Sequence, residues 1–272
     1  MKKNAIKILT PFFICFLIAN SLAQDKSSHE IGIIAGSASF TTDYGQRYDF
    51  ESNVGGNVGP GFGLVYYITF TDYRYRWNQR TNYWQEHFKI RTEISYMTAK
   101  LEHFGKWRNA TKSNGELTDG AKKLRAHTGT TKVFNLGAQL EFNLVDIVDF
   151  GSRRIPHLKW SPYLSAGVFV NFYNPSIYSE LGDWRDPGVL YPKWDINDYY
   201  YAARDTKGVT MSISGGLGTR YKIGEYADLV FESRWQFFVS NYVDGLNARQ
   251  APENKFNDWL LFIHVGYVYY LN

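Results

Sequence analysis

The chain has 272 residues with a net charge of +4, an aromatic content of 18% and a single cysteine. This length accommodates one large all-β domain or two smaller ones, and the small charge excess argues against a general nucleic-acid binder. The cysteine, Cys15, lies in an N-terminal leader, so we expect neither disulfides nor thiol chemistry in the rest of the chain.

Residues 1–23 have the pattern of a secretory signal peptide. Three lysines precede an apolar run over residues 8–19, and Ser21-Leu22-Ala23 matches a small-x-small cleavage site. The apolar run is too short for a transmembrane helix, which needs about 20 residues. Cleavage after Ala23 removes the three lysines and lowers the net charge from +4 to +1. Residues 24–272 are then the exported domain.

Eight segments of the exported domain alternate apolar and polar residues with the period of two that β-strands show. In the segment VFNLGAQLEFNL, the even positions from Phe134 to Leu144 are apolar, and the odd positions from Asn135 to Asn143 are polar or small. The predicted strands cover about residues 29–40, 61–71, 88–96, 133–144, 164–172, 209–222, 229–239 and 259–269.

The connections between these segments alternate between long and short. The long ones are polar and irregular, and they cover about residues 41–58, 103–128, 173–207 and 241–257. The shorter ones cover about 72–86, 146–160 and 224–228. Long outer loops and short inner turns are typical of outer-membrane barrels. The pattern predicts an eight-stranded antiparallel transmembrane β-barrel in the cell outer membrane, with both termini in the periplasm and its apolar face against outer-membrane lipid.

The polar rows of the strands carry charged residues that would face the barrel lumen. An eight-stranded barrel is just wide enough inside for side chains to fill it, and an unpaired buried charge costs several kcal/mol. We therefore expect the charges to pair across the lumen and to plug it, in preference to an open channel. The predicted lumen charge network comprises Arg91, Glu93, Glu141, Arg220, Glu232 and Arg234.

Motifs for catalysis and cofactor binding are missing from the sequence. The glycine clusters at 59–63 and 215–218 precede no helical pattern and do not match a phosphate-binding loop. The six histidines show no zinc-ligand spacing. Lipid A deacylases place a serine two residues from a histidine, and here Gly266 occupies that position after His264. We predict no enzyme activity, no catalytic residue, no cofactor and no metal.

Basic and aromatic residues gather in two inner connections. The hairpin between the second and third strands has its expected turn near residues 78–82, and both strands are predicted to run past the membrane there. One interpretation is an aromatic girdle with arginines that contact lipid head groups. The other is a docking surface for a periplasmic partner. The residues of this inner patch are Arg74, Arg76, Trp77, Arg80, Arg153 and Arg154.

Two stretches resemble a known family. HEIGIIAGSASFTTDYG at 29–45 and GFGLVYYITF at 61–70 resemble the small Bacteroidota outer-membrane barrels related to PorG, which are accessory components of type IX secretion. The resemblance implies a non-enzymatic barrel that contacts a periplasmic ring built from a lipoprotein and its soluble partner. The last strand also resembles the general barrel-assembly signal, through His264, Gly266, Tyr269 and Leu271.

The leading hypothesis is therefore a non-enzymatic accessory or scaffold barrel of an envelope complex that serves type IX protein secretion. The alternative is a small OmpA- or OmpX-like structural or pore-forming outer-membrane protein. No nucleic-acid partner is expected for either function.

Overall fold

The computed structural model describes residues 27–46, 54–70, 82–150, 158–195, 202–248 and 257–271. The strands within these ranges are β1 (Ser28–Thr41), β2 (Val58–Thr69), β3 (Phe88–Glu102), β4 (His127–Asn143), β5 (Trp160–Tyr173), β6 (Ser176–Ser179), β7 (Gly208–Gly224), β8 (Ala227–Phe238) and β9 (Trp259–Tyr270). The predicted leader 1–23 lies outside the described residues, as do the residues of the predicted inner patch.

Eight of these strands form a closed antiparallel barrel. Each strand from β1 to β4 pairs with the next, β5 pairs with β7, and β7, β8 and β9 continue the ring. Pairing of β1 with β9, from Glu30↔Tyr270 to Thr41↔Trp259, closes it. The short strand β6 extends the sheet beside one end of β4. The predicted fold class, an eight-stranded antiparallel β-barrel, is confirmed.

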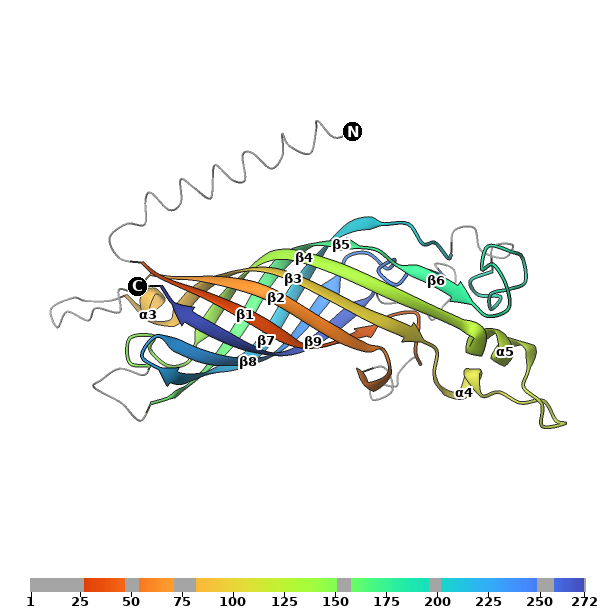
Figure 1. Ribbon diagram of the computed structural model, residues 1–272, viewed down its shortest axis with the longest axis horizontal. Helices are drawn as coiled ribbons and strands as arrows, with labels where there is room; N and C mark the ends of the chain where they lie inside the picture. Colours follow the sequence, from red (N-terminus) through yellow and green to blue (C-terminus); the bar gives the residue numbers. More distant parts are fainter. Residues whose placement is uncertain are drawn as a thin grey trace, which may run out of the picture.

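The barrel is elongated and its strands are tilted relative to its long axis, with the start of β1 and the end of β9 at the same end (Figure 1). Helix α3 (Tyr83–His87) lies at this inner end, whereas α4 (Gly105–Arg108), α5 (Asp119–Ala126) and β6 lie at the opposite, outer end. None of the helices in the described ranges is long and apolar enough to cross a membrane.

The two faces of the barrel wall have opposite chemistry, as the alternation predicts. On β3, Ile94 is 47% exposed, while the neighbouring Glu93 is 1% exposed and points into the lumen. If this row of apolar side chains faced water, each of them would lose about 1.5–3 kcal/mol of hydrophobic free energy. In lipid the row is favourable, and closure of the barrel satisfies the backbone hydrogen bonds without water. The outward face is therefore a membrane-facing surface.

The connections differ from the sequence prediction in two ways. The expected inward extension of the third strand is wrong, because helix α3 occupies Tyr83–His87 immediately before β3. The outer connections are more ordered than their polar composition indicates, since they contain α4, α5 and β6. In α5 the hydroxyl of Thr118 accepts a hydrogen bond from the backbone N–H of Ala121 at 3.2 Å and so caps the first turn.

The outer connections also pack into a hydrophobic cap over the mouth of the barrel. Its residues come from four connections that are far apart in sequence and from the outer ends of the strands. The buried members include Phe40, Tyr44, Leu101, Leu124, Leu190, Trp194, Val243 and Leu246. Because these side chains bury against one another, the cap gains the hydrophobic stabilisation that a polar, irregular loop would lack. The cap lies above a lumen that is filled by polar side chains.

Candidate functional site: the barrel lumen and its outer cap

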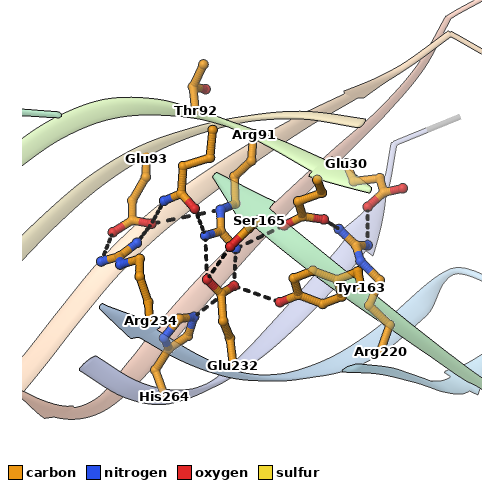
Figure 2. Close-up of polar contacts among 12 residues, drawn as sticks. Glu30, Arg91, Thr92, Glu93, Tyr163, Ser165, Arg220, Glu232, Arg234 and His264 are labelled. Atoms are coloured by element: carbon orange, nitrogen blue, oxygen red, sulfur yellow. Dashed lines mark hydrogen bonds and ion pairs between the residues drawn. The ribbon is translucent and has the colours of Figure 1, made fainter. Parts of the chain in front are cut away.

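The predicted lumen charges lie together at the centre of the barrel. β3 supplies Arg91 and Glu93, β4 supplies Glu141, β7 supplies Arg220, and β8 carries two further members. All six predicted residues are at most 1% exposed, and they belong to one connected set of ion pairs and hydrogen bonds (Figure 2). The alternation of each strand aims these side chains inward, and the narrow barrel brings strands that are not neighbours within reach.

Arg91 and Glu232 form the centre of this network. Both terminal nitrogens of Arg91 donate to the Glu232 carboxylate, and Nη1 also donates to Glu141 Oε1 at 2.9 Å. The second terminal nitrogen donates in addition to the amide oxygen of Gln139. The hydroxyl of Tyr163 donates to Glu232 Oε2 at 2.7 Å. A planar guanidinium that binds a carboxylate through two parallel bonds fixes both side chains in orientation.

A second bidentate pair lies on the outer side of this centre. Arg234 donates from Nη1 and Nη2 to the two carboxylate oxygens of Glu93, at 2.5 and 2.9 Å. The rings of Phe169 and Phe262 lie near the Arg234 guanidinium, with centroid distances of 4.9 and 5.2 Å. The aromatic faces favour a cation, so Arg234 is stabilised by rings as well as by its carboxylate.

The network continues toward the inner end through residues that the sequence prediction did not include. Arg220 donates to Glu30 at 2.6 Å and to Glu141 at 3.2 Å, and its guanidinium lies 4.3 Å from the Tyr67 ring centroid. Lys89 donates to the other oxygen of Glu30 at 2.6 Å. A further pair, Lys222 with Asp228 at 3.2 Å, lies nearer the end of the barrel.

The described lumen network is balanced in charge. Its acids are Glu30, Glu93, Glu141, Asp228 and Glu232, and its bases are Lys89, Arg91, Arg220, Lys222 and Arg234. Removing charges from water costs several kcal/mol for each ion, and only close, hydrogen-bonded pairing offsets that cost. Each of the five acids lies within ion-pair distance of at least one of the five bases, so the pairing condition is met and the lumen is a packed polar core.

The residues of the predicted barrel-assembly signal lie on both faces of β9, with Leu271 directly after its end. His264 faces the lumen, where its ring stacks on Phe262 with a centroid distance of 4.6 Å and Nε2 lies 3.8 Å from Glu232. A Cβ on Gly266 would lie 2.9 Å from Ile34 Cγ2 on β1, so this glycine permits close packing beside the β1–β9 closure. Tyr269 and Leu271 point outward and are about half exposed.

Two histidines that sequence reasoning did not single out lie at the centre of the outer cap. Nδ1 of His127 lies 3.1 Å from Nε2 of His103, and Nε2 of His127 lies 2.9 Å from the Tyr44 hydroxyl. The His103 ring stacks between Tyr44 and Trp194, with centroid distances of 4.7 and 5.0 Å. Burial, together with nearby positive groups, holds the pKa of His103 well below its usual value, so the ring is neutral at pH 7.

Three aspartates meet at the cap beside this aromatic cluster. Asp244 accepts hydrogen bonds from the backbone N–H groups of Asp43 at 3.0 Å and Leu246 at 2.8 Å, and Asp258 accepts one from Val243 at 2.9 Å. Burial and the neighbouring carboxylate of Asp43 raise the pKa of Asp244 to about 8. The stability of the cap therefore depends on pH.

No protein-family model and no curated protein sequence matches the chain. Several solved structures are similar in fold. One is a major outer membrane protein from Thermus thermophilus, at 11% identity over 90% of this chain and 99% of that chain, with a TM-score of 0.48. Another is Ail of Yersinia pestis, in complex with the heparin analogue sucrose octasulfate, at 12% identity over 90% and 99%, with a TM-score of 0.42.

OprG from Pseudomonas aeruginosa is also similar, at 12% identity over 91% of this chain and 98% of that chain, with a TM-score of 0.38.

The closed ring of eight strands, the apolar exterior and the charge-filled interior of the present structure define its class. The chain is a small outer-membrane β-barrel protein.

Proposed function

We propose that this protein is a non-enzymatic, non-conducting structural barrel of the outer membrane. The observation that carries the proposal is the packed lumen: Arg91, Arg220 and Arg234 are each at most 1% exposed, and each donates to lumen carboxylates. A conducting pore needs a continuous wet path along which ions bind weakly enough to leave. Here guanidinium groups and carboxylates occupy that path, and they bind each other.

The outer cap adds a second barrier to conduction. Tyr44 and Leu246 are buried at the outer end of the barrel, and His103, His127 and Trp194 pack beside them. An ion that entered from outside would have to displace this hydrophobic cluster before it reached the charged lumen. Two successive barriers of different chemistry support a structural function over the alternative of a small pore.

Planar-bilayer recording tests this proposal. The purified barrel should give no stable open-state conductance in about 1 M salt, where exposed charges are strongly screened, whereas a porin added to the same bilayer conducts. The variant Glu232→Ser with Arg91→Ser removes the central ion pair but leaves the outer cap in place, so it should also give no stable open state. Stable conductance by the unmodified protein would contradict the proposal.

The absence of enzyme activity is also part of the proposal. The polar side chains of the lumen hydrogen-bond mainly to each other, and His264 packs on Phe262 with Gly266 two residues further along the strand. A hydrolase of the deacylase type needs a nucleophile within hydrogen-bond reach of its base. Incubation of the purified barrel with lipid A should therefore leave the lipid unchanged by mass spectrometry, and a deacylated product would overturn this part.

At a finer level, we propose that the barrel is an accessory of type IX protein secretion. The support is the resemblance of residues 29–45 and 61–70 to the PorG-related barrels. The proposed partner is a periplasmic lipoprotein or ring complex that docks on the inner patch. Deletion of the gene should reduce the secreted proteins, and normal secretion in the deletion strain would contradict this assignment.

The docking step has its own test. Replacing Trp77 together with Arg74, Arg76 and Arg80 by alanine should abolish co-purification of the periplasmic partner and leave barrel assembly intact. If the patch contacts only lipid head groups, the variant will retain its partners, and the docking proposal fails.

A further inference from the structure

A group of three metal-ligand side chains lies at the inner end of the barrel. Glu86 and His87 end helix α3, and Asp146 lies in the turn after β4, the strand that pairs with β3. One ligand atom from each residue lies within 4.8 Å of the other two. The three residues are separated by 59 positions in the chain, counted from His87 to Asp146, so no ligand spacing in the sequence indicates the group.

The strand register brings these residues together. Phe88 pairs with Phe142 at the inner end of the β3–β4 ladder, which places His87 beside Asn143. The side chain of Asn143 donates to the His87 carbonyl at 3.2 Å, and the backbone N–H of Ile147 donates to the Glu86 carbonyl at 2.8 Å. Two cross-links therefore hold the end of α3 against the turn that contains Asp146.

The hydrogen bond of His87 determines which ring nitrogen is available. Nδ1 lies 2.8 Å from the backbone carbonyl of Asn143, and because a carbonyl can only accept, Nδ1 carries the hydrogen. In the neutral ring, Nε2 then has the lone pair, and Nε2 lies 3.1 Å from Asp146 Oδ1. Metal-binding histidines commonly donate their other N–H to a backbone carbonyl, which fixes the tautomer and the ring orientation.

Neighbouring rings keep the imidazole in this position. The Tyr83 ring lies 4.4 Å and the Phe142 ring 5.7 Å from the His87 ring, measured between centroids. A ligand whose rotamer is already fixed by packing loses little freedom when it binds a metal. The side chain of His87 is 13% exposed and that of Asp146 is 43% exposed, so an ion has access from solvent.

We propose that Glu86, His87 and Asp146 bind a divalent transition-metal cation of the Zn²⁺ type. Zinc bonds to imidazole nitrogen and carboxylate oxygen are about 2.0–2.2 Å long, so two ligand atoms around a tetrahedral ion are about 3.4 Å apart. The separation of 3.1 Å between Nε2 and Oδ1 is close to that value. Imidazole with carboxylates is a ligand set that suits such cations, and three protein ligands leave a position for water.

The bound ion would join two inner connections of the barrel. Helix α3 belongs to the connection before β3, and Asp146 belongs to the connection between β4 and β5. An ion bound by both connections adds a coordination cross-link at the inner mouth. It would reinforce the hydrogen bonds from Asn143 to the His87 carbonyl and from Ile147 to the Glu86 carbonyl. The alternative arrangement is a simple ion pair between a protonated His87 and Asp146, which requires no metal.

Zinc titration of the tag-free barrel, stripped with chelator and held in detergent micelles, tests the site. The unmodified protein should bind one Zn²⁺ per chain by calorimetry, and Asp146→Asn should weaken the affinity by about tenfold or more. Asp149→Asn is the matched control, because it removes the same charge from the same turn and should change the affinity by less than about twofold.

A second variant and a spectroscopic probe distinguish ligation from a structural effect. His87→Gln keeps a donor for the Asn143 carbonyl but removes the imidazole lone pair, and it should bind zinc as weakly as Asp146→Asn. With Cu²⁺ as the probe, electron paramagnetic resonance should show coupling to one imidazole nitrogen. Unheated migration on a denaturing gel verifies that each variant is a folded barrel. Equal zinc affinity of the folded Asp146→Asn variant and the unmodified barrel would overturn the proposal.

Discussion

Replacing Glu232 by glutamine removes the negative charge at the centre of the lumen and nearly preserves the side-chain volume. Glu232 accepts hydrogen bonds from Arg91, from the Tyr163 hydroxyl at 2.7 Å and from the Ser165 hydroxyl at 3.1 Å. In the variant, Arg91 remains buried and retains Glu141 at 2.9 Å, with Glu93 further away at 4.0 Å.

The expected loss of stability follows from this loss of one partner. Breaking a buried ion pair by removing one member costs about 3–5 kcal/mol, because the remaining charge is left in a low-dielectric interior. The surviving contact of Arg91 with Glu141 offsets part of that cost, so we expect a value near the lower limit, about 3 kcal/mol. The double variant Arg91→Gln with Glu232→Gln should cost less than the sum of the single changes, since it leaves no orphaned charge.

Urea unfolding of the barrel in lipid vesicles, followed by tryptophan fluorescence, measures this free energy. The matched control is Glu102→Gln at the outer end of β3, where the side chain is 33% exposed and contacts Lys100 at 3.0 Å. Pairs of this exposed kind contribute about 1 kcal/mol or less. If Glu232→Gln costs no more than Glu102→Gln, water reaches the lumen charges, and the argument for a packed interior is refuted.

Three further predictions concern the lipid face, the barrel closure and the outer cap. Phe231→Arg on the lipid face should cost about 2–4 kcal/mol in the same unfolding assay, and Phe231→Leu should cost less than about 1.5 kcal/mol. Gly36→Ala should destabilise the barrel by about 1–3 kcal/mol, because a Cβ there would lie 2.0 Å from the Ile263 carbonyl oxygen, whereas Gly215→Ala, which meets nothing within 4 Å, should be nearly neutral. The raised pKa of Asp244 makes the cap lose stability as the pH rises from about 4 to about 8. The lowered pKa of His103 opposes this effect below about 6.5, so the net loss is expected between about pH 6.5 and 8. Hydrogen exchange of residues 242–248 measures this loss, and exchange that is independent of pH between about 6.5 and 8, after correction for the intrinsic rate, would contradict the assignment.

The strands and their orientation could be predicted from sequence because β-structure has a local period. The alternation from Phe134 to Leu144 already indicates which residues face lipid, and in the structure Leu136 pairs with Ile94, which also faces outward. Arg91 and Glu232 could likewise be placed in the lumen from the polar rows of their own strands. Their pairing with one another could not, because it depends on which strands lie opposite across the closed barrel.

The parts that sequence reasoning missed are those created by contacts between distant segments. Glu30 lies near the start of β1, where a charge could equally be exposed at the membrane edge, and only closure of the barrel brings it to Arg220 across the lumen. His103 and His127 are 24 residues apart in a polar connection and meet because β3 and β4 extend beyond the membrane. Helix α3 is too short for its periodicity to be recognised, since five residues complete little more than one turn.

The measurement that tests the sealed lumen most directly is the labelling of single cysteines introduced into a variant without Cys15, which then has no other thiol. Ser95 lies in the lumen at 1% exposure, and Ser176 lies exposed on β6 at the outer end. With a charged, water-soluble thiol reagent, Ser176→Cys should react rapidly in the folded barrel, while Ser95→Cys should react only after unfolding. Labelling of folded Ser95→Cys at a rate similar to that of Ser176→Cys would contradict a packed, closed interior.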